Sequence, residues 1–347
     1  MTLKQRIEAF SGLGSILRNI LDGKENSIGK GFLSLIENQY KTNPWFTAEN
    51  VRMAVGALAE KLTGESLRRW TERYPSLNEE YKPLRVGVIM AGNIPLVGFH
   101  DFLTVLISGN KLIAKTSSKD SGLISGIAEI LFNINSEFRN LIEFADGPLK
   151  NFNVVIATGS DNSSRYFEYY FGKYPHIIRK NRNSIAIIDG DEKDEDLRNL
   201  GTDIFSYFGL GCRNVSKIYL PSGFDPDRMI RNWSYFSGII NHNKYANNYE
   251  YNMAVYLVTS EKFLDTGYLL LRENASLSSP IAVLHYQYYN SPEEVSRDIE
   301  SQNEKIQCIV SKRNVPYGMS QKPDLWEYAD NVDTLDFLLK KNLPGIM

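Results

Sequence analysis

Short apolar segments alternate with helix-like stretches from residue 85 onward, and this alternation is the strongest constraint on the fold. The first segment, residues 86–90, is continuously apolar, which is typical of a strand that is buried on both faces of a sheet. Comparable segments follow at residues 112–115, 154–157 and 184–188. The stretches between them predict helices at residues 96–108, 120–132 and 161–171. Strands and helices in this order predict a parallel, doubly wound α/β sheet.

The alternation is repeated in the second half of the chain, after an acidic segment at residues 189–196. This segment is the predicted domain boundary, and its simplest interpretation is a solvated loop that leads into a helix. We predict further strands at residues 217–220, 253–258, 281–286 and 306–310. Helices are predicted at residues 225–239 and 292–302. Before the first strand, residues 1–80 predict a set of helices, with Thr47 as the N-cap of one of them.

The composition excludes several classes of function. The 347 residues include 39 basic and 41 acidic side chains, so the formal net charge is only −2 and we expect no nucleic-acid partner. The two cysteines, Cys212 and Cys308, and the four histidines lack the spacing of metal ligands, so no metal site is predicted. So few cysteines suit a reducing compartment.

No segment predicts an export signal or a membrane span. Charged residues interrupt the apolar positions of residues 1–23, whereas a secretory signal needs a continuous apolar core. The most apolar window, residues 86–99, is too short to cross a bilayer and contains Asn93 and Pro95. We therefore expect a cytoplasmic protein without stable membrane insertion.

The segment at residues 205–217 places Cys212 just before a predicted strand. Gly209 and Gly211 remove side chains near the cysteine, so that the carbonyl group of another molecule can approach its thiol. Arg213 follows directly, and a neighbouring cation favours the thiolate, which is the nucleophilic form. The alternative is that Cys212 is a small buried residue at a junction between a loop and a strand.

Three further polar segments come directly after predicted strands, where open α/β sheets bind their ligands. Asn93 follows the first strand, where it can donate to an oxyanion or else form an Asx turn. Residues 115–119 combine lysines with hydroxyl groups, which suit a ribose or a phosphate, or else form a solvated strand end. Residues 159–160 start a helix whose free amides can face a pyrophosphate. None of the strands is followed by a GxGxxG motif.

In this order, the segments resemble the aldehyde dehydrogenase superfamily and, more closely, its acyl-CoA reductase (LuxC-like) branch. The resemblance covers about residues 40–345 and is most specific at residues 86–119, 176–188, 204–221 and 324–334. It implies an α/β protein with an aldehyde dehydrogenase-like fold, in which an N-terminal helical segment accompanies two doubly wound α/β domains. The implied parts are N-terminal helices that pack on the cofactor domain (1–80), a nicotinamide cofactor-binding domain (81–190), a catalytic cysteine domain (191–315) and a C-terminal segment (316–347).

The resemblance also implies roles for individual residues. Cys212 is similar in position to the nucleophile, and Asn93 is similar to the oxyanion-hole asparagine that acts with the backbone N–H of the cysteine. The implied cofactor-binding residues are Lys115, Ser117, Ser118, Gly159 and Ser160. We expect NADPH rather than NADH, because a carboxylate at position 118 would repel a 2′-phosphate, and this chain has a serine there followed by Lys119.

Two departures from the superfamily pattern bear on the reaction. The ribose-binding glutamate is missing, because residues 276–278 offer only hydroxyl groups before the Ser279–Pro280 pair. Hydrolytic aldehyde dehydrogenases carry a general-base glutamate in a segment where residues 178–183 contain no carboxylate. Without such a base, water attacks an acyl-cysteine slowly. His100, on the helix after Asn93, is the alternative base that the sequence leaves open.

We therefore predict that the chain reduces an acyl-CoA or acyl-carrier thioester, with a fatty acyl group, to the aldehyde through an acyl-Cys212 intermediate. One alternative is an NAD(P)-dependent aldehyde dehydrogenase that makes the acid. The other is a catalytically silent subunit that binds acyl donors. A homo-oligomer or a partner acyl-transfer protein is also left open. Cys308 lies in a predicted buried strand and is expected to be inert.

Overall fold

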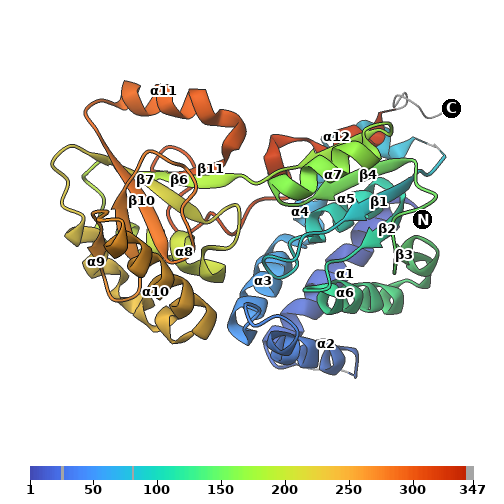
Figure 1. The fold of residues 1–347 in the computed structure, drawn as a ribbon. Helices are drawn as coiled ribbons and strands as arrows, with labels where there is room; N and C mark the ends of the chain where they lie inside the picture. Colours follow the sequence, from blue (N-terminus) through green and yellow to red (C-terminus); the bar gives the residue numbers. More distant parts are fainter. Residues whose placement is uncertain (25–26, 80–81, 341–347) are drawn as a thin grey trace. The chain divides into compact units, whose positions relative to one another are not determined.

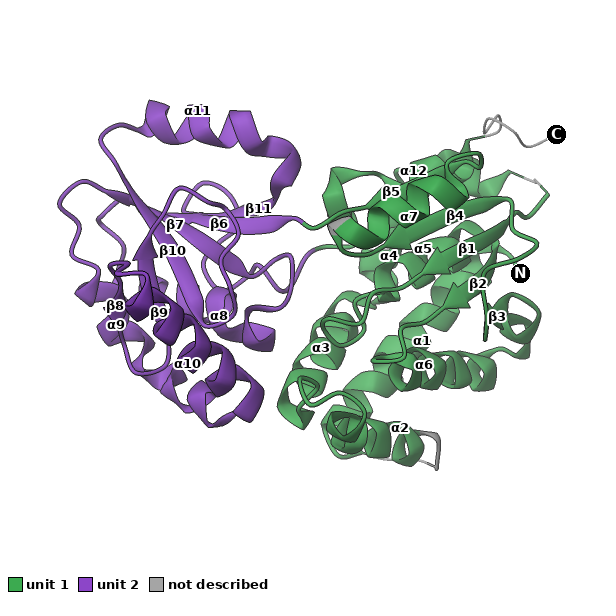
Figure 2. Ribbon diagram, viewed as in Figure 1, with its two compact units in different colours: residues 1–181, 324–347 green, residues 182–323 purple. Residues whose placement is uncertain are grey.

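The computed structural model describes residues 1–24, 27–79 and 82–340, and it divides into two compact units (Figures 1 and 2). Unit 1 contains residues 1–181 together with the segment from Asp324 onward, and unit 2 contains residues 182–323. Each unit has its own sheet and its own hydrophobic core. Compactness alone assigns no function to either unit, so the four functional segments inferred from the sequence stay a prediction.

Unit 1 is built around a parallel sheet with the strand order β3-β2-β1-β4-β5. Its strands are β1 (Arg85–Ile89), β2 (Lys111–Lys115), β3 (Ile142–Phe144), β4 (Val154–Thr158) and β5 (His176–Arg179). The connecting helices are α5 (Phe99–Ser108), α6 (Ser121–Ile134) and α7 (Asp161–Phe171). The strand order reverses at β1, so right-handed crossovers place α5 and α6 on one face and α7 on the other (Figure 1). The carboxyl ends of β2, β1 and β4 therefore lie side by side.

Among the described residues before β1, four helices pack within unit 1, as the sequence predicts. They are α1 (Leu3–Leu21), α2 (Ser27–Asn38), α3 (Ala48–Lys61) and α4 (Gly64–Thr71). The apolar face of α1 supplies Phe10, Leu13 and Leu17, which are fully buried in the same core as the sheet. The predicted N-cap is confirmed, because Thr47 Oγ1 accepts a hydrogen bond from the N–H of Asn50 at 3.2 Å.

The C-terminal segment returns to unit 1 and is fixed there by side-chain hydrogen bonds. Trp70 Nε1 donates to the hydroxyl oxygen of Tyr328 at 2.8 Å, and both residues are buried. Helix α12 (Thr334–Leu339) follows, and Thr334 Oγ1 accepts a hydrogen bond from Arg179 at the end of β5. The guanidinium of Arg179 also forms a buried ion pair with Asp101 on α5. These contacts join the two ends of the chain around one sheet.

Unit 2 contains a six-stranded sheet with the order β11-β6-β7-β10-β9-β8. All neighbours pair in parallel except β8 and β9, which are antiparallel at one edge. The strands are β6 (Asn183–Ile187), β7 (Val215–Pro221), β8 (Leu264–Asp265), β9 (Leu270–Glu273), β10 (Val283–Tyr289) and β11 (Ile306–Val310). The helices are α8 (Asp194–Phe205), α9 (Asp227–Trp233), α10 (Asn243–Val258) and α11 (Pro292–Gln302).

Short 3₁₀ helices complete both units. In unit 1 they are η1 (Gln39–Lys41), η2 (Pro75–Asn78), η3 (Ser136–Asn140) and η7 (Ala329–Asn331). In unit 2 they are η4 (Ser206–Gly209), η5 (Ser234–Asn241) and η6 (Asn303–Lys305). No helix in the described part of the chain is long and apolar enough to cross a membrane.

Two predictions about individual strands are wrong. Residues 184–188 do not close the first sheet, because residues 183–187 form β6 in the sheet of unit 2. The first sheet is closed by β5, in which buried and half-buried residues alternate, as is typical of an edge strand. Its pattern therefore lacks the continuous apolar run by which β1, β2 and β4 are recognised.

Residues 253–258 were predicted as a strand and instead form the end of α10. The β-branched Val255 and Val258 in this range face outward, with exposed fractions of 36% and 85%. The buried face consists of residues at helical spacing, namely Tyr245, Tyr249, Asn252 and Tyr256. Asn252 is polar but faces inward, whereas Val255 and Val258 are apolar but face outward. The sequence therefore does not show the amphipathic pattern that identifies a helix.

We expect Gly14→Ala in α1 to destabilise unit 1. A Cβ at this position would overlap the carbonyl oxygen of Leu62, which belongs to the backbone and cannot move aside. Overpacking of this kind costs roughly 1–3 kcal/mol. The matched control is Gly12→Ala in the same helix, where the nearest atoms belong to the side chain of Ile134 at 3.7 Å. The control is expected to leave stability unchanged or to raise it by up to about 1 kcal/mol, since alanine favours the helix.

The free energy of unfolding would be measured by chemical denaturation of both variants and the parent protein. Equal midpoints for the two variants would show that α1 does not approach the chain at Leu62 as closely as the structure indicates.

Candidate active site

Cys212 lies at the tip of a tight turn that leads into β7. The backbone N–H of Asn214 donates to the carbonyl of Gly211 at 3.0 Å and closes the turn around Cys212 and Arg213. In return, the N–H of Gly211 donates to Asn214 Oδ1 at 2.8 Å. On the other side, the carbonyl of Cys212 accepts a hydrogen bond from Ser184 Oγ in β6 at 2.9 Å. The half-buried cysteine is thus held through its backbone.

The residues before this turn have an unusual backbone conformation. Tyr207, Phe208 and Gly209 have φ angles of 52°, 59° and 75°, all in the left-handed region. Glycine adopts this conformation freely, whereas each of the other two costs roughly 1–2 kcal/mol. Packing holds them, because Tyr207 is buried and the ring of Phe208 lies 4.3 Å from the ring of His242 between centroids. The left-handed backbone conformation at residue 209 therefore favours glycine, in addition to the space that a glycine leaves near Cys212.

A cavity of about 70 Å³ borders the turn. Its apolar lining comes from Phe205, Phe208, Tyr245, Leu269, Ile281 and Val283. Its polar lining residues include Asn183 and Ser216, which lie near the starts of β6 and β7. The cavity and the cysteine turn therefore both lie at the amino edge of the sheet of unit 2.

The second cysteine has different surroundings. Cys308 lies within β11 with 9% of its surface exposed, and its Sγ is 3.1 Å from Ser184 Oγ. The backbone N–H of Cys308 donates to the same oxygen at 3.2 Å. The predicted buried strand is confirmed, and the expected inertness of the thiol stays a prediction.

Arg213, which follows Cys212, is held by a backbone carbonyl. Arg213 Nη1 donates to the backbone carbonyl of Ser320 at 3.2 Å, and the N–H of Ser320 donates to the buried carboxylate of Asp203 at 2.9 Å. Burial raises the pKa of Asp203, while the hydrogen bonds to its carboxylate lower it. The guanidinium of Arg213 therefore anchors the backbone at Ser320, and its support for a thiolate at Cys212 stays a prediction.

In unit 1, the predicted cofactor residues lie at the carboxyl edge of the sheet. Lys115 is the last residue of β2 and pairs in register with Ile89 of β1. The loops after these two strands touch, because a Cβ on Gly92 would lie 2.5 Å from Ser117 Oγ. The structure thus brings the loop of Asn93 next to that of Ser117 and Ser118. Residues 159–160 follow the neighbouring β4 at the same edge.

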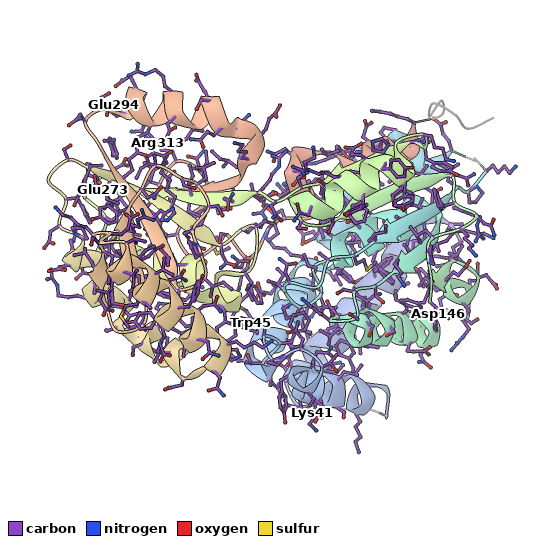
Figure 3. The ribbon with its side chains drawn as sticks, in the orientation of Figure 1. Lys41, Trp45, Asp146, Glu273, Glu294 and Arg313 are labelled. Carbon is purple, nitrogen blue, oxygen red and sulfur yellow. The ribbon has the colours of Figure 1, made fainter. Side chains whose placement is uncertain are left out.

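These side chains suit a ligand with phosphate and ribose groups. Lys115 Nζ donates to the carbonyl of Asp146 at 3.0 Å. Asp146, labelled in Figure 3, lies in the loop after β3. Ser118 is exposed, and the exposed Ser160 caps α7, accepting from the N–H of Ser163 at 3.3 Å. A Cβ on Gly159 would lie 2.8 Å from that of Ser163, so this position admits no side chain. A cation, hydroxyl groups and a helix N-terminus on one sheet edge fit a nicotinamide dinucleotide.

Asp120 joins two of these loops and was not recognised in the sequence. Its Oδ2 accepts a hydrogen bond from the N–H of Leu96 at 2.8 Å, and Leu96 has a left-handed φ of 58°. The carboxyl is only 3% exposed, and Oδ1 has no hydrogen-bond partner within the described residues. Burial raises the pKa of Asp120 to about 7, although the bond from Leu96 lowers it. Asp120 therefore fixes the loop that carries Asn93.

His100, the alternative base, is packed within unit 1. Its Nε2 lies 2.9 Å from the carbonyl of Leu325, so this nitrogen must carry the proton and donate. The ring contacts Trp70 and Tyr328, at centroid distances of 5.9 and 5.3 Å. This contact engages Nε2, and the role of His100 as a base stays a prediction.

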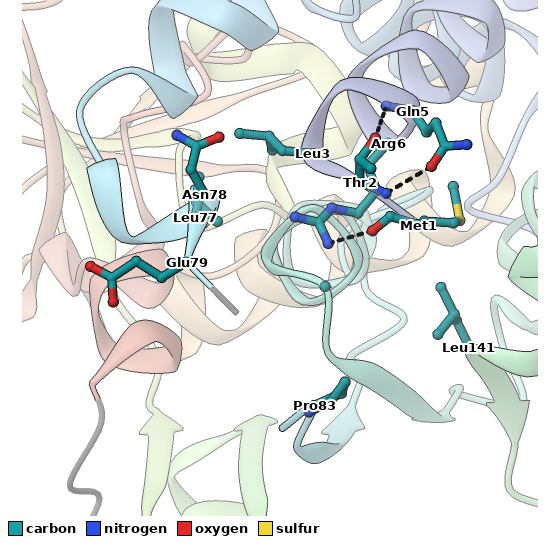
Figure 4. Close-up of a pocket in the computed structure, with 11 residues that line it drawn as sticks. Met1, Thr2, Leu3, Gln5, Arg6, Leu77, Asn78, Glu79, Pro83 and Leu141 are labelled. Carbon is teal, nitrogen blue, oxygen red and sulfur yellow. Dashed lines mark hydrogen bonds between the residues drawn. The ribbon is translucent and has the colours of Figure 1, made fainter. Parts of the chain in front are cut away.

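A larger cavity of about 690 Å³ lies elsewhere in unit 1 (Figure 4). Pro83 and Gly109 on its wall precede β1 and β2, so it lies at the amino edge of the sheet. Its polar groups bind one another, as in the hydrogen bonds from Arg6 to the carbonyl of Met1 and from the N–H of Thr2 to Gln5. Because open α/β sheets bind ligands at the carboxyl edge, we assign no site here.

The family model of acyl-CoA reductase (LuxC) matches residues 56–229, which is half of the chain. The chain belongs to the acyl-CoA reductase (LuxC) family. This assignment makes it an enzyme of the oxidoreductase class. The matched region contains Asn93, Lys115, Ser160 and Cys212. No curated protein matches the sequence.

Solved structures share the fold at low sequence identity. Aldehyde dehydrogenase 21 from Physcomitrella patens, in complex with the reaction product succinate, is 13% identical with a TM-score of 0.69, covering 98% of this chain and 84% of that one. An aldehyde dehydrogenase from Mycobacterium tuberculosis complexed with NAD⁺ is 14% identical with a TM-score of 0.63, covering 92% and 75%. An NAD⁺ complex of aldehyde dehydrogenase from Bacillus cereus is 12% identical with a TM-score of 0.61, covering 90% and 72%. The predicted fold class and family are both confirmed.

The buried carboxyl of Asp120 is expected to make the stability of the protein depend on pH. Its folded-state pKa of about 7 lies above the ordinary value near 3.8, so it stabilises the folded state below pH 4 and this stabilisation is lost as pH rises through 7. Asp120→Asn keeps an oxygen for the N–H of Leu96 but cannot ionise. Relative to the parent protein, its free energy of unfolding should rise by up to about 1.4 kcal/mol for each pH unit between about pH 4 and 7, and then level off.

Denaturation at several pH values tests this expectation, with Asp22→Asn at the exposed end of α1 as a control for the loss of one carboxylate. A difference between Asp120→Asn and the parent that stays constant with pH would contradict it.

Proposed function

We propose that this protein reduces an acyl thioester, either an acyl-CoA or an acyl-carrier thioester with a fatty acyl group, to the aldehyde with NADPH. The observation that carries the proposal is the half-buried Cys212 at the tip of a turn that is fixed by Asn214 and Ser184. A thiol that is accessible and held on a rigid backbone suits a nucleophile for acyl transfer. Membership of the acyl-CoA reductase family supports this reaction.

The first half-reaction transfers the acyl group to Cys212. The thiolate attacks the thioester carbonyl carbon, a new C–S bond forms, and an electron pair moves onto the oxygen. We assign the resulting oxyanion to the carboxamide of Asn93 and the backbone N–H of Cys212, on the basis of the family pattern. When the carbonyl re-forms, the C–S bond to the carrier breaks, and the carrier thiolate leaves and takes a proton from water.

The second half-reaction reduces the acyl group on Cys212. Bound NADPH supplies the hydride, as the cofactors of this class do. We assign Lys115 and Ser117 to the ribose, Ser118 to the 2′-phosphate, and Gly159 and Ser160 to the pyrophosphate. Two of the solved structures named above are complexes with NAD⁺, which supports a nicotinamide cofactor. The thiohemiacetal anion on Cys212 then collapses, which releases the aldehyde and restores the thiolate.

The segment between β5 and β6 favours reduction over hydrolysis. Arg179 is occupied by Asp101 and Thr334, and Arg182 Nη1 donates to the carbonyl of Ile306 at 3.3 Å. Neither guanidinium can accept a proton from water. A general base typically contributes about 10²–10⁴-fold, so the acyl group on Cys212 should hydrolyse slowly. The alternative reaction, oxidation of an aldehyde to the acid, requires rapid hydrolysis.

The cytoplasm is the setting that suits this reaction. Both cysteines are free thiols, and the proposed nucleophile must stay reduced to act. The carrier of the acyl group, coenzyme A or a carrier protein, is the proposed partner. A homo-oligomer and a separate acyl-transfer protein are further proposals.

We expect a labelled acyl-CoA to acylate the parent protein and Cys308→Ala at about one group per chain, but not Cys212→Ala. The half-buried thiol is accessible to the substrate, whereas the thiol in β11 is buried. Mass spectrometry of the intact chain measures the product. Equal acylation of the two single variants would overturn the assignment of the nucleophile.

The fate of the isolated acyl-protein separates the three candidate functions. Added NADPH should yield aldehyde, added coenzyme A should remove the acyl group, and buffer alone should release acid slowly. Rapid release of acid in buffer would favour the aldehyde dehydrogenase, and an acyl group that is inert to NADPH would favour the silent subunit. Repeating the NADPH reaction over a series of acyl chain lengths would define the substrate.

The choice of cofactor is expected to depend on Ser118. Its hydroxyl group and the adjacent cation of Lys119, both exposed, suit the 2′-phosphate of NADPH. Ser118→Glu should lower kcat/KM for NADPH by about tenfold or more and leave the value for NADH within about threefold. Ser121→Glu, on the first turn of α6, is the control for an added charge. A parent protein that prefers NADH, with the preference unchanged in Ser118→Glu, would contradict this prediction.

A further inference from the structure

The side chain of Asn214 connects the two sides of the candidate nucleophile. The residue is only 3% exposed. Its Nδ2 donates to the carbonyls of Ser206 and Asp203, at 2.8 and 3.1 Å, and lies 3.4 Å from that of Ile204. Its Oδ1 accepts from the N–H of Gly211. One carboxamide therefore binds the chain both before and within the cysteine turn.

The need for these bonds follows from the way α8 ends. The last carbonyls of a helix have no partners within the helix and are commonly capped by a glycine just beyond its end. Here the chain continues into the left-handed residues 207–209. The donor for the carbonyls of Asp203, Ile204 and Ser206 is Asn214, which follows Cys212 in the chain. The end of α8 and the cysteine turn are thus fixed by the same group.

The end of α8 is itself anchored. The carboxylate of Asp203 accepts hydrogen bonds from the N–H groups of Gly318 and Ser320, at 2.6 and 2.9 Å. The carbonyl of Ser320 in turn accepts from Arg213 in the cysteine turn. Asn214 therefore links Cys212 to a frame with several fixed points and not to a mobile loop.

We propose that Asn214 is a positioning residue, which holds residues 211–214 so that the thiol and the backbone N–H of Cys212 face an acyl carbonyl together. This inference rests on the proposed function, since it concerns the acyl-transfer step of that reaction. Attack on a thioester needs both groups in a fixed direction, and a displacement of about 1 Å can cost 10²-fold. Alkylation by a small uncharged reagent needs only an accessible thiolate, so it does not depend on this direction.

The two reactions of Cys212 distinguish positioning from simple loss of structure. We expect Asn214→Ala in the Cys308→Ala background to lower the single-turnover rate of acylation by acyl-CoA by about 100-fold. Its alkylation by iodoacetamide should stay within about threefold of the parent. The control is Asn110→Ala in unit 1, because Asn110 is fully buried and holds Leu84 and Ser108 through its side chain. The control should lower the thermal stability and leave the acylation rate of the folded protein within about threefold.

Asn214→Asp is a second variant that keeps the shape of the side chain. Its carboxyl group still accepts from the N–H of Gly211, but it donates to the carbonyls only when it is protonated. The ratio of its acylation rate to that of the parent should therefore be highest at pH 6 and fall as pH rises to 9. This pH dependence would not arise from a general loss of packing.

Three results would overturn the inference: an acylation rate of Asn214→Ala within threefold of the parent, equal losses of acylation and alkylation, or a pH-independent ratio for Asn214→Asp. Failure of the proposed function is a separate result, because in that case the parent protein itself would not be acylated at Cys212.

Discussion

The reversal of the chain between α8 and β7 is the constraint on which the candidate nucleophile depends. A helix that ends beside a buried strand leaves carbonyls that need donors, and burial makes an unsatisfied carbonyl costly. The structure meets this need with a buried carboxamide from the far side of the turn. Two non-glycine residues in the left-handed conformation are held in place by packing. The geometry of Cys212 is thus set by the folding of unit 2 itself.

The two sheets present their polar groups at opposite kinds of edge. In unit 1, Asn93, Lys115 and Ser160 are at or just beyond the carboxyl ends of parallel strands, the usual position for ligands of an open α/β sheet. In unit 2, Cys212 precedes β7 and lies at the amino end of that strand. Loops after strands combine helix N-termini and hydroxyl groups for an anionic ligand, whereas a turn that enters a strand presents one side chain on a rigid support. This difference matches the different roles proposed for the two units.

Much of the fold could be predicted from the sequence, because continuous apolar runs identify strands that are buried on both faces. The edge strand β5 and the helix α10 were not identified, because in neither does the apolar pattern of the sequence match the pattern of burial. In β5 the buried positions alternate with half-buried ones, and in α10 the inward stripe contains Asn252 while Val258 faces water. Both patterns depend on what covers each side chain, which is a property of the tertiary structure.

The candidate residues could be predicted by resemblance, but the groups that hold them could not. Asp120 accepts a hydrogen bond from the backbone of Leu96, which is 24 residues earlier in the chain. Asn214 donates to the backbone of Ser206, on the other side of the cysteine turn. In the sequence, Asn214 is simply a polar residue two positions after Cys212, and such residues are common in turns. Only the structure shows that its amide faces three carbonyls at once.

The proposed direction of the reaction rests on the composition of residues 178–183 and on the contacts that the arginines among them make. If Arg179 were free, it would stabilise a nearby anion, but its guanidinium is held by Asp101 and Thr334 within unit 1. Arg182 likewise donates to a backbone carbonyl. Residues 178–183 contain no carboxylate that could accept a proton. The absence of such a base slows the attack of water on an acyl-cysteine more than the attack of a thiol. A thiol with a pKa of about 8.5 ionises appreciably near neutrality, whereas water needs a base to become a nucleophile. On the proposed assignment of Cys212, we therefore expect its acyl group to exchange with thiols or to accept a hydride before it hydrolyses, as in a thioester reductase.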